Sequence, residues 1–334
     1  MKLDNILMLI LFVGILITSG CIDNGDDSEA NTSPVAVNEF NITPNPVPGG
    51  QSTSVYMELE NTGDKQINDV YARLFGPTFP TNDPGTWRTS DGGEVSSTDR
   101  TLNIGDLETA TDTSPAIPGS DRVTLTSPSI DEGKINPYTF NAKLQYQTRT
   151  TGSAEIQMMS NERYQEKDVG QTSPPVDTSD GPIQFDVQGT TPHVFYSDGT
   201  GNEEICITVR NEGSGTPFLT TTSDGISTEE DTGYDVNEDA KGKVELRVED
   251  VGNVELSSQE NGGNSATVEL IGSEGYQCFD MELVGLGEVT DLEQTTEIPI
   301  EVVYGYEEET STSVTVEGRP SGSSDPGDAD SEDE

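Results

Sequence analysis

Basic residues and histidine are scarce in this chain of 334 residues. Lysine and arginine number 16 against 62 aspartates and glutamates, a formal net charge of -46, and His193 is the only histidine. Binding to nucleic-acid phosphates needs a basic face, so the composition excludes a nucleic-acid partner. A Ser-His-Asp triad would have to use His193, yet no G-x-S-x-G nucleophile elbow accompanies it. We therefore interpret His193 as a structural residue at a strand edge and expect no enzyme.

Apolar residues are scarce as well, at 30% against the roughly 45–50% of ordinary soluble proteins. Low hydrophobicity with high net charge fits either a disordered chain or a folded protein from a high-salt environment, where the Debye length falls to about 3 Å at 1 M salt. Regular alternation such as SVYMELEN, residues 54–61, favours the folded, salt-adapted alternative. The composition therefore predicts a halophilic protein that unfolds when it is desalted.

Long hydrophobic runs are absent apart from residues 6–17, which are followed by Thr18, Ser19, Gly20 and Cys21. This run is shorter than the roughly 20 residues of a membrane-spanning helix and matches the 7–15 residues of a secretory signal. TSGC resembles the lipobox of bacterial and archaeal lipoproteins, with threonine where leucine is commonest. The resemblance implies a signal peptide at 1–20, a lipid on Cys21 that holds the protein to the outer face of the cell membrane, and an acidic flexible tether at 21–34. The alternative is an uncleaved anchor, which also puts the remaining chain outside the cell.

One pattern occurs twice in the chain. Residues 49–64 and 199–214 each alternate apolar and polar residues and end in N-x-G, which predicts a half-buried strand followed by a turn. Residues 138–159 and 296–318 each alternate in two segments, and we expect a turn between the segments, near Gly152 in the first copy and at acidic residues in the second.

The fold class that these strands predict is all-β, with two tandem immunoglobulin-like antiparallel β-sandwiches behind the N-terminal segment. The proline-rich lead-in, PGG, alternating strand and N-x-G resemble the immunoglobulin-like, adhesion-related modules common in archaeal surface and S-layer-associated proteins. Such modules share a fold and a cell-surface location but no active site. The predicted boundaries are a sandwich at 35–170 with a long insertion at 76–117, a proline-rich linker at 171–180, a sandwich at 181–318 and a disordered acidic tail at 319–334.

Cys206 and Cys278 are the two remaining thiols. By alternation both lie on the face opposite the apolar positions of their strands, and outside the membrane an even pair of cysteines usually forms a disulfide. We expect a structural bridge between neighbouring strands. Tyr276 resembles, by its spacing to Cys278, the tyrosine corner of antibody domains, although the core tryptophan of those domains is missing here.

The insertion at 76–117 contains the only tryptophan, Trp87, beside Arg88 and close to Phe79. Long loops are often functional, so these three residues are candidates for contact with a protein or glycan. The alternative is that Trp87 packs onto the edge of the sandwich.

Two further sets of residues are candidates for modification and for metal binding. Asn31 and Asn41 lie in N-x-[ST] sequons, which suit an exported chain. Asp235, Asn237 and Asp239 alternate as in a calcium loop, but the glycine comes late and the final glutamate is missing, so they are weak candidates. No cofactor is expected.

These features predict a non-enzymatic structural, adhesion or envelope-binding module, anchored by lipid on Cys21 and facing a cell-envelope protein or glycan. The alternative is an extracytoplasmic ligand-binding or scaffold subunit of a transporter or secretion complex. A third hypothesis is a hydrolase that uses paired carboxylates about 5–9 Å apart in one cleft.

Overall fold

The computed structural model describes residues 33–77, 86–96, 98–111, 113–167, 169–196, 203–220, 227–229, 233–236, 238–260, 262–284 and 292–318. The chain divides into two compact units, Met1–Thr32 and Ser33–Glu334, and all described residues belong to the second. The predicted signal peptide, Cys21, Asn31 and the tail at 319–334 lie outside the described residues. In the part of the chain that is described, no helix has the length and apolarity needed to cross a membrane.

Almost all regular structure in the described ranges is strand, with one short α-helix and one 3-10 helix. The elements are β1 (Val35–Thr43), β2 (Val47–Pro48), β3 (Ser52–Asn61), β4 (Ile67–Phe75), β5 (Arg88–Thr89), η1 (Thr98–Arg100), β6 (Thr101–Leu107), β7 (Gly119–Thr126), β8 (Ile135–Ser160), α2 (Asn161–Lys167), β9 (Val176–Thr178), β10 (Ile183–Gln188), β11 (His193–Phe195), β12 (Glu203–Asn211), β13 (Thr216–Phe218), β14 (Ser227–Glu229), β15 (Gly233–Asp235), β16 (Lys243–Val248), β17 (Val254–Ser258), β18 (Ser265–Glu269), β19 (Glu274–Leu283) and β20 (Glu293–Glu317).

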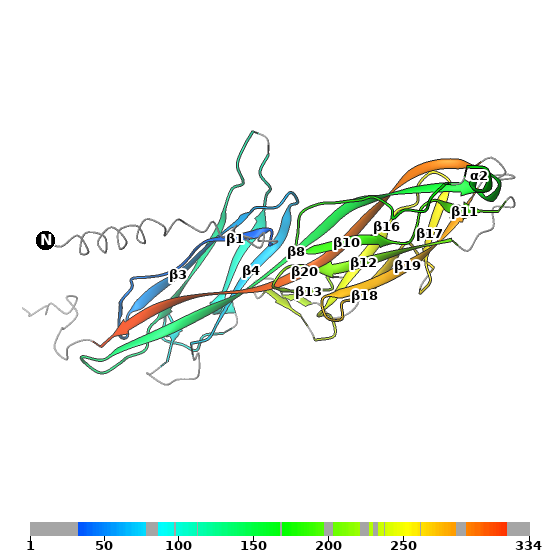
Figure 1. Cartoon of the computed structure of the whole chain (residues 1–334). Coiled ribbons are helices and arrows are strands. Elements are labelled where there is room, and N and C mark those ends of the chain that lie inside the picture. Colours follow the sequence, from blue (N-terminus) through cyan, green and yellow to red (C-terminus); the bar gives the residue numbers. More distant parts are fainter. Residues whose placement is uncertain are drawn as a thin grey trace, which may run out of the picture. The chain divides into compact units, whose positions relative to one another are not determined.

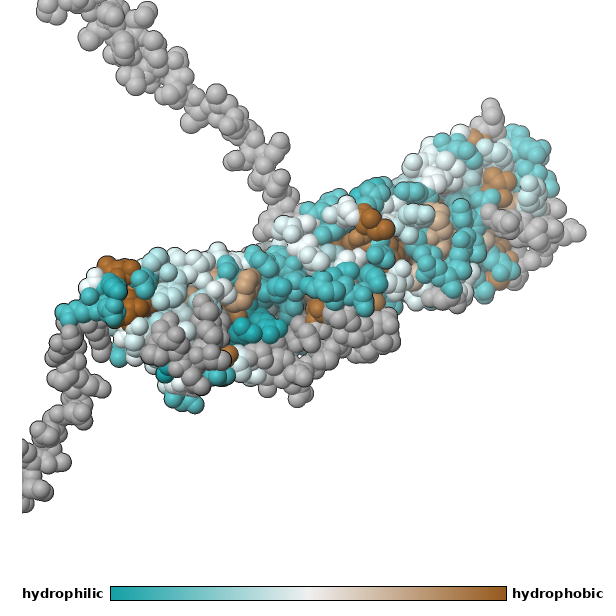
Figure 2. All heavy atoms as spheres, turned by 90° about the horizontal axis from the view of Figure 1, so that it is seen from below, coloured by the Kyte–Doolittle hydropathy of each residue, from teal (hydrophilic) through white to brown (hydrophobic). Residues whose placement is uncertain are grey.

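The described strands form two four-stranded sheets, one ten-stranded sheet and a two-stranded sheet of β14 and β15. The four-stranded sheets have the orders β1-β3-β7-β5 and β10-β12-β19-β17, and the long path of the ten-stranded sheet is β18-β16-β20-β8-β4-β6. Buried aliphatic and aromatic side chains from the two four-stranded sheets and the ten-stranded sheet form one continuous core, whereas the face of the molecule in Figure 2 is largely hydrophilic with small, separate apolar patches. The predicted all-β sandwich class is confirmed.

Strands β8 and β20 run side by side and extend through the strands of both predicted sandwiches, 35–170 and 181–318 (Figure 1). They pair antiparallel without a break from Glu293↔Met159 to Glu317↔Ile135, which at about 3.3 Å per residue makes a ribbon of roughly 80 Å. The ten-stranded sheet therefore continues through both predicted sandwiches. The segment at 171–180 also joins this sheet, because β9 pairs with β8. The division into domains at these boundaries stays a prediction.

The predicted turn near Gly152 is wrong, because β8 continues straight through this residue. A Cβ on Gly152 would lie 2.0 Å from the carbonyl oxygen of Asp177 and 2.8 Å from the ring of Phe185. Glycine inside a strand often marks close backbone approach rather than a turn. Here its missing side chain lets the chain around β9 lie directly against β8.

The predicted acidic turn in 296–318 is wrong too, because β20 passes through Glu307 and Glu308 as a strand. Lys143 Nζ lies 3.0 Å from Glu307 Oε1, and the hydroxyl of Tyr146 donates a hydrogen bond of 2.8 Å to Glu308 Oε1. Both carboxylates are thus paired with side chains of β8. Because their charges are compensated there, the acidic residues remain within the strand.

The two N-x-G turns have the same hydrogen bonds. The side-chain oxygen of Asn61 accepts from the Gly63 N–H at 3.0 Å while its amide donates to the Lys65 carbonyl at 2.8 Å. Asn211 repeats this with the N–H of the residue two positions on, at 3.2 Å, and the carbonyl four positions on, at 2.9 Å. The repeated sequence pattern therefore produces the same local structure at the ends of β3 and β12.

The predicted disulfide is confirmed. Cys206 of β12 and Cys278 of β19 are directly opposite each other in the ladder and are bonded through their sulfur atoms. Tyr276 is 71% exposed, so the likeness to a tyrosine corner, whose ring packs inward, is wrong. The short helix α2 follows directly on β8.

Candidate binding groove

Of the two alternatives for Trp87, the structure shows the packed one, and Trp87 is not part of an exposed contact surface. Its side chain is 1% exposed, and its ring packs edge-on against Phe140 at 4.9 Å and Tyr138 at 5.6 Å between ring centroids. The indole is therefore part of the hydrophobic core, where two aromatic residues of β8 pack against it. Arg88 is half-buried in β5, and Phe79 lies outside the described residues.

The other predicted sites are only partly described. Asn41 is half-buried in β1 and its side-chain amide donates to the Glu39 carboxylate. Asp239 is exposed in a turn, the backbone of Asp235 lies in β15, and Asn237 lies outside the described residues. Glycosylation and calcium binding at these positions stay predictions.

His193 is 5% exposed in β11, which pairs in parallel with β8. Its Nδ1 lies 3.0 Å from Glu203 Oε2. The imidazole thus joins β11 to the start of β12, which is the structural role that the sequence predicts.

A polar groove lies on the face of the ten-stranded sheet that points away from the core. In β20 the residues Ile300 and Val302 are buried while Glu301 between them is partly exposed. Two adjoining hollows, of about 450 Å³ and about 260 Å³, share Arg247 and Glu301. We call them together the polar groove, and it is lined by Gln66, Asn68, Gln147, Thr148, Arg149, Thr151, Gly152, Arg247, Val248, Glu249, Asn264, Ser265, Pro299, Ile300, Glu301 and Val303.

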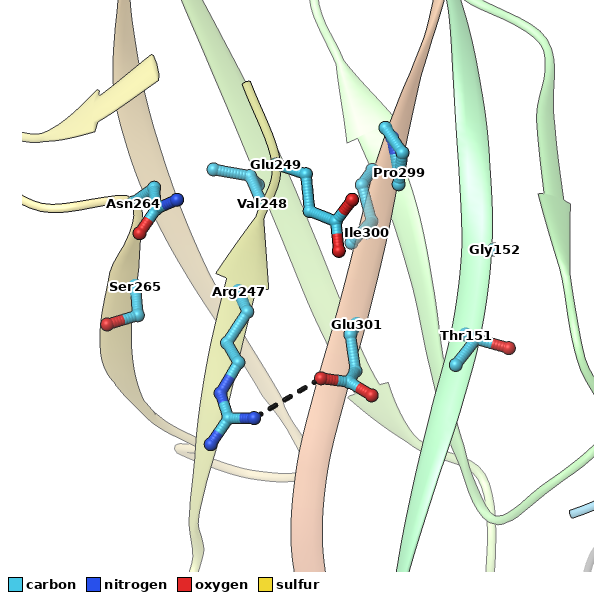
Figure 3. Close-up of a pocket in the computed structure, with 10 residues that line it drawn as sticks. All are labelled: Thr151, Gly152, Arg247, Val248, Glu249, Asn264, Ser265, Pro299, Ile300 and Glu301. Atoms are coloured by element: carbon cyan, nitrogen blue, oxygen red, sulfur yellow. Dashed lines mark hydrogen bonds and ion pairs between the residues drawn. The ribbon is translucent and has the colours of Figure 1, made fainter. Parts of the chain in front are cut away.

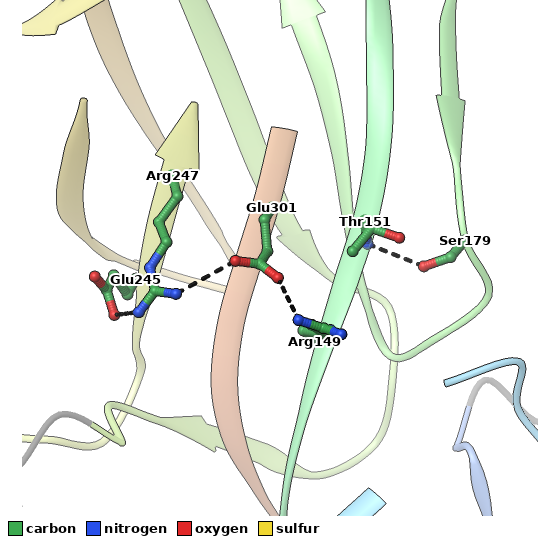
Figure 4. Close-up of polar contacts among 6 residues, drawn as sticks. All are labelled: Arg149, Thr151, Ser179, Glu245, Arg247 and Glu301. Atoms are coloured by element: carbon green, nitrogen blue, oxygen red, sulfur yellow. Dashed lines mark hydrogen bonds and ion pairs between the residues drawn. The ribbon is translucent and has the colours of Figure 1, made fainter. Parts of the chain in front are cut away.

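Glu301 is the centre of an ion-pair relay across three strands (Figure 4). It accepts hydrogen bonds from Arg149 Nη1 at 3.0 Å and from Arg247 Nη1 at 3.3 Å. Arg247 also donates through Nη2 to Glu245 at 2.8 Å. The hydrogen bond to Glu245, followed by the charges of Glu245 and Glu301, raises the pKa of Arg247. Two cations thus balance two anions, so this part of the groove is close to neutral in a strongly acidic chain.

The rest of the lining combines amide and hydroxyl side chains with the Glu249 carboxylate, apolar residues and a glycine. Figure 3 shows Asn264 and Ser265 on one side of the larger hollow, across from Glu301 and Thr151. In the smaller hollow, Asn68 of β4 lies opposite Gln147 of β8 in the ladder. Among the described residues, no aromatic ring lines either hollow. The groove therefore offers many hydrogen-bond donors and acceptors with little net charge.

Both carboxylates of the relay are engaged with arginine. Glu301 accepts hydrogen bonds from Arg149 and Arg247, and Glu245 accepts one from Arg247. These ion pairs hold the two guanidinium groups in place on the floor of the groove, an arrangement suited to binding a polar ligand. The hydrolase stays the third hypothesis.

Sequence reasoning missed the groove, although its signal is present in the sequence. Arg149, Arg247 and Glu301 all occupy outward positions of alternating strands. Arginine is rare in this chain, so two arginines at outward positions are informative. Their convergence depends on the pairing of β16, β20 and β8, which alternation alone does not reveal.

Comparison with known proteins gives no family assignment. No family model matches the chain, and no curated protein matches it either. Among solved structures, the CupB6 tip adhesin from Pseudomonas aeruginosa has a TM-score of 0.18 at 7% identity over 85% of this chain and 94% of its own. The collagen adhesin (CNA) from S. aureus has a TM-score of 0.11 at 9% identity over 86% and 94%. Both are adhesins, but likeness at this level carries no argument about function, which must come from the residues of this chain.

Proposed function

We propose that this chain is a non-enzymatic, lipid-anchored binding module on the outer surface of a salt-adapted archaeon. A lipid on Cys21 attaches it to the membrane, and the polar groove holds an uncharged, hydroxyl-rich segment of an envelope glycan. The observation that carries the proposal is the composition of the groove, in which the relay of Arg149, Glu301, Arg247 and Glu245 is charge-balanced and is flanked by amides and hydroxyls. Such a surface matches the alternating donors and acceptors of a sugar better than it matches an ion.

An adhesion or envelope-binding role also suits the continuous ribbon of β8 and β20. The two strands pass without a break through both predicted sandwiches. The described residues therefore contain no flexible hinge segment between these two halves that lacks strand pairing. Solute-binding subunits of transporters commonly close two lobes around their ligand by hinge motion. The extracytoplasmic transporter subunit therefore remains the second candidate, and the ribbon favours the surface module over it.

The test is binding of the full chain to glycans released from the producing cell's envelope and immobilised at high salt. Arg247→Gln and Glu301→Gln each break the relay, and we expect both to weaken binding at least tenfold. Arg122→Gln removes an exposed arginine of β7 on a different sheet and should bind like the wild type. The relay is partly exposed, so its loss should cost only about 0–1 kcal/mol of stability. Unchanged affinity in both groove variants would overturn the proposal, as would failure of the wild type to bind.

A further inference from the structure

The smaller hollow of the polar groove, of about 260 Å³, is where carboxamide side chains gather. Its described lining consists of the carboxamides Gln66, Asn68 and Gln147, the hydroxyl residue Thr148, the aliphatic Val303 and the ions Arg149, Arg247 and Glu301. Pockets for drug-sized ligands have volumes of roughly 300–1,000 Å³. The hollow therefore suits one sugar unit with its substituent rather than a whole oligosaccharide.

A β-bulge in β4 presents two of these carboxamides. Ile67 and Val70 are both fully buried although they are three positions apart, which breaks the alternation of a regular strand. The register of β4 shifts at this place against both of its neighbours, β6 and β8. An extra residue in a strand turns the side chains on one side of it to the opposite face. The bulge thus puts Ile67 into the core and leaves Gln66 and Asn68 exposed on the outer face.

Asp69 is the residue that forms the bulge. Its φ of 51° lies in the left-handed region, which is unfavourable for residues other than glycine and which aspartate tolerates better than most. Its backbone N–H donates a hydrogen bond of 2.9 Å to Asp106 Oδ1, so a side chain of β6 stabilises the irregular backbone. Unfavourable backbone conformations of this kind cluster at functional sites.

The bulge also places Asn68 directly opposite Gln147 of β8 in the ladder. Side chains in such positions have Cβ atoms about 5 Å apart, so the two carboxamides adjoin. Within the described ranges, neither carboxamide group hydrogen-bonds to another residue. Each of them therefore offers N–H donors and a carbonyl acceptor to a ligand.

Val303 is the one aliphatic side chain among the described residues that line the smaller hollow. It is half-buried on β20 and lies directly opposite Arg149 of β8 in the ladder. Arg149 follows Gln147 by two positions in β8, and residues two positions apart along a strand share a face. A small apolar surface therefore adjoins the carboxamides.

The charged residues of the hollow are paired with one another. Glu301 is the one carboxylate among the described lining residues, and it accepts hydrogen bonds from both Arg149 and Arg247 (Figure 4). A charged ligand group would have to compete with these ion pairs. The hollow therefore favours a neutral group that has a donor, an acceptor and a small apolar part.

We propose that the smaller hollow binds the acetamido group of an N-acetylated sugar, an inference that rests on the glycan-binding function proposed above and names the sugar class. A secondary amide carries one N–H donor, one carbonyl acceptor and, in the acetamido group, a methyl group. The carboxamides of Asn68 and Gln147 pair with the donor and the acceptor, and Val303 packs against the methyl group. A hydroxyl group in the same place has no methyl group to bury against Val303.

The first experiment is ligand-observed saturation-transfer NMR with the full chain at high salt. The probes are N-acetylglucosamine and N-acetylgalactosamine, each compared with its parent sugar, glucose or galactose. We expect the acetyl methyl protons to receive the strongest saturation. At least one N-acetylated sugar should bind roughly tenfold or more tightly than its parent sugar, because the parent leaves the carboxamides and Val303 without partners.

Two variants test the two parts of the site. Asn68→Ala removes a carboxamide from the exposed bulge, and Val303→Thr keeps the branched shape while it replaces a methyl group by a hydroxyl group. Each should remove most of the preference for the N-acetylated sugar. Asn103→Ala is the matched control, because Asn103 is an exposed asparagine of β6 outside the described lining. It should keep the preference of the wild type.

The outcomes separate this inference from the function on which it rests. If the chain binds the immobilised envelope glycans but binds N-acetylated and parent sugars equally, the acetamido inference is overturned and the glycan-binding function stands. If the chain binds neither the envelope glycans nor the free sugars, both are overturned. A wild-type preference in both Asn68→Ala and Val303→Thr would overturn the assignment of the acetamido group to this hollow.

Discussion

Single residues explain where the chain departs from simple alternation. Gly152, in the middle of β8, is required by the approach of another backbone and not by a turn. At the middle of the β8–β20 ribbon, Tyr146, Tyr304 and Tyr306 are fully buried, and each hydroxyl has a hydrogen-bond partner. These four residues lie on the two shared strands, so changes in them should affect the whole described body.

Gly152→Ala should destabilise the protein by about 1–3 kcal/mol, the usual cost of overpacking. Its new Cβ would overlap the Asp177 carbonyl oxygen, which is backbone and cannot rotate away. Gly170→Ala is the matched control, because nothing lies within 4 Å of a Cβ built there. Denaturant unfolding in high salt measures both variants, and equal midpoints would contradict the close approach of the chain around β9.

Alkaline pH should destabilise the fold through the buried tyrosines. Burial raises the pKa of Tyr306 to about 12 and also raises the pKa of Tyr304, whereas an unfolded tyrosine titrates near 10. Their contribution is therefore fully present below about pH 10. Above that pH the unfolded chain loses these protons first, so stability falls by about 1.4 kcal/mol per pH unit for each such tyrosine.

Tyr304→Phe should accordingly flatten the dependence of unfolding free energy on pH between about 10 and 12. Tyr276→Phe is the control variant, because Tyr276 is 71% exposed. Denaturant unfolding midpoints of both variants and the wild type, measured across this pH range, test the prediction. The same slope in Tyr304→Phe and in the wild type would show that Tyr304 ionises in the folded protein as it does in the unfolded chain.

At the scale of elements, the sequence predicts the strands that repeat but not the way they join. Alternation correctly identifies the faces of β3 and β12, the N-x-G pattern predicts their terminal turns, and the positions of Cys206 and Cys278 predict their bridge. The length of β8 and β20 is not predictable in this way. Glycine and acidic residues usually end strands, and only their partners across the sheet reveal that here they do not.

The same limit applies to the candidate site. Arg247 and Glu301 are recognisable as outward residues, but they are 54 positions apart in sequence and meet only through the register of β16 and β20. Trp87 illustrates a further limit. Its place in a long, weakly periodic segment leaves both an exposed contact and packing onto the sandwich open, and only the packed structure, with the ring against Phe140, decides between them.

The disulfide is the covalent link within the second four-stranded sheet. It joins residues 72 positions apart, and closing a loop of this length is worth about 4 kcal/mol on the chain-entropy model. Replacing both Cys206 and Cys278 by serine should lower the free energy of unfolding by about this amount. Cys21→Ser, which leaves the Cys206–Cys278 bridge intact, is the control and should keep the wild-type value. Calorimetric or denaturant unfolding measures the difference. A double variant as stable as the wild type would contradict the stabilisation expected from the disulfide.

For the whole molecule, the dominant fact is its net charge of -46. Such a charge destabilises a compact state by self-repulsion, and salt screens it by shortening the Debye length. The melting temperature should therefore rise steeply with potassium chloride, and the chain should unfold near zero salt. Circular dichroism during dialysis measures this, with sucrose as an uncharged control. A protein that stays fully folded without salt would contradict the halophilic interpretation.

The central claim is that the chain works outside the cell, held to the membrane by a lipid on Cys21. The most direct measurement is the intact mass of the mature protein from membrane fractions of cells that make the wild type or Cys21→Ser. We predict cleavage before Cys21 with a lipid adduct in the wild type, and loss of the adduct together with release from the membrane in the variant. An uncleaved, unmodified chain that is equally membrane-bound in both strains would contradict the claim. Residues 6–17 would then serve as the anchor, and a subunit of a membrane complex would become the leading hypothesis.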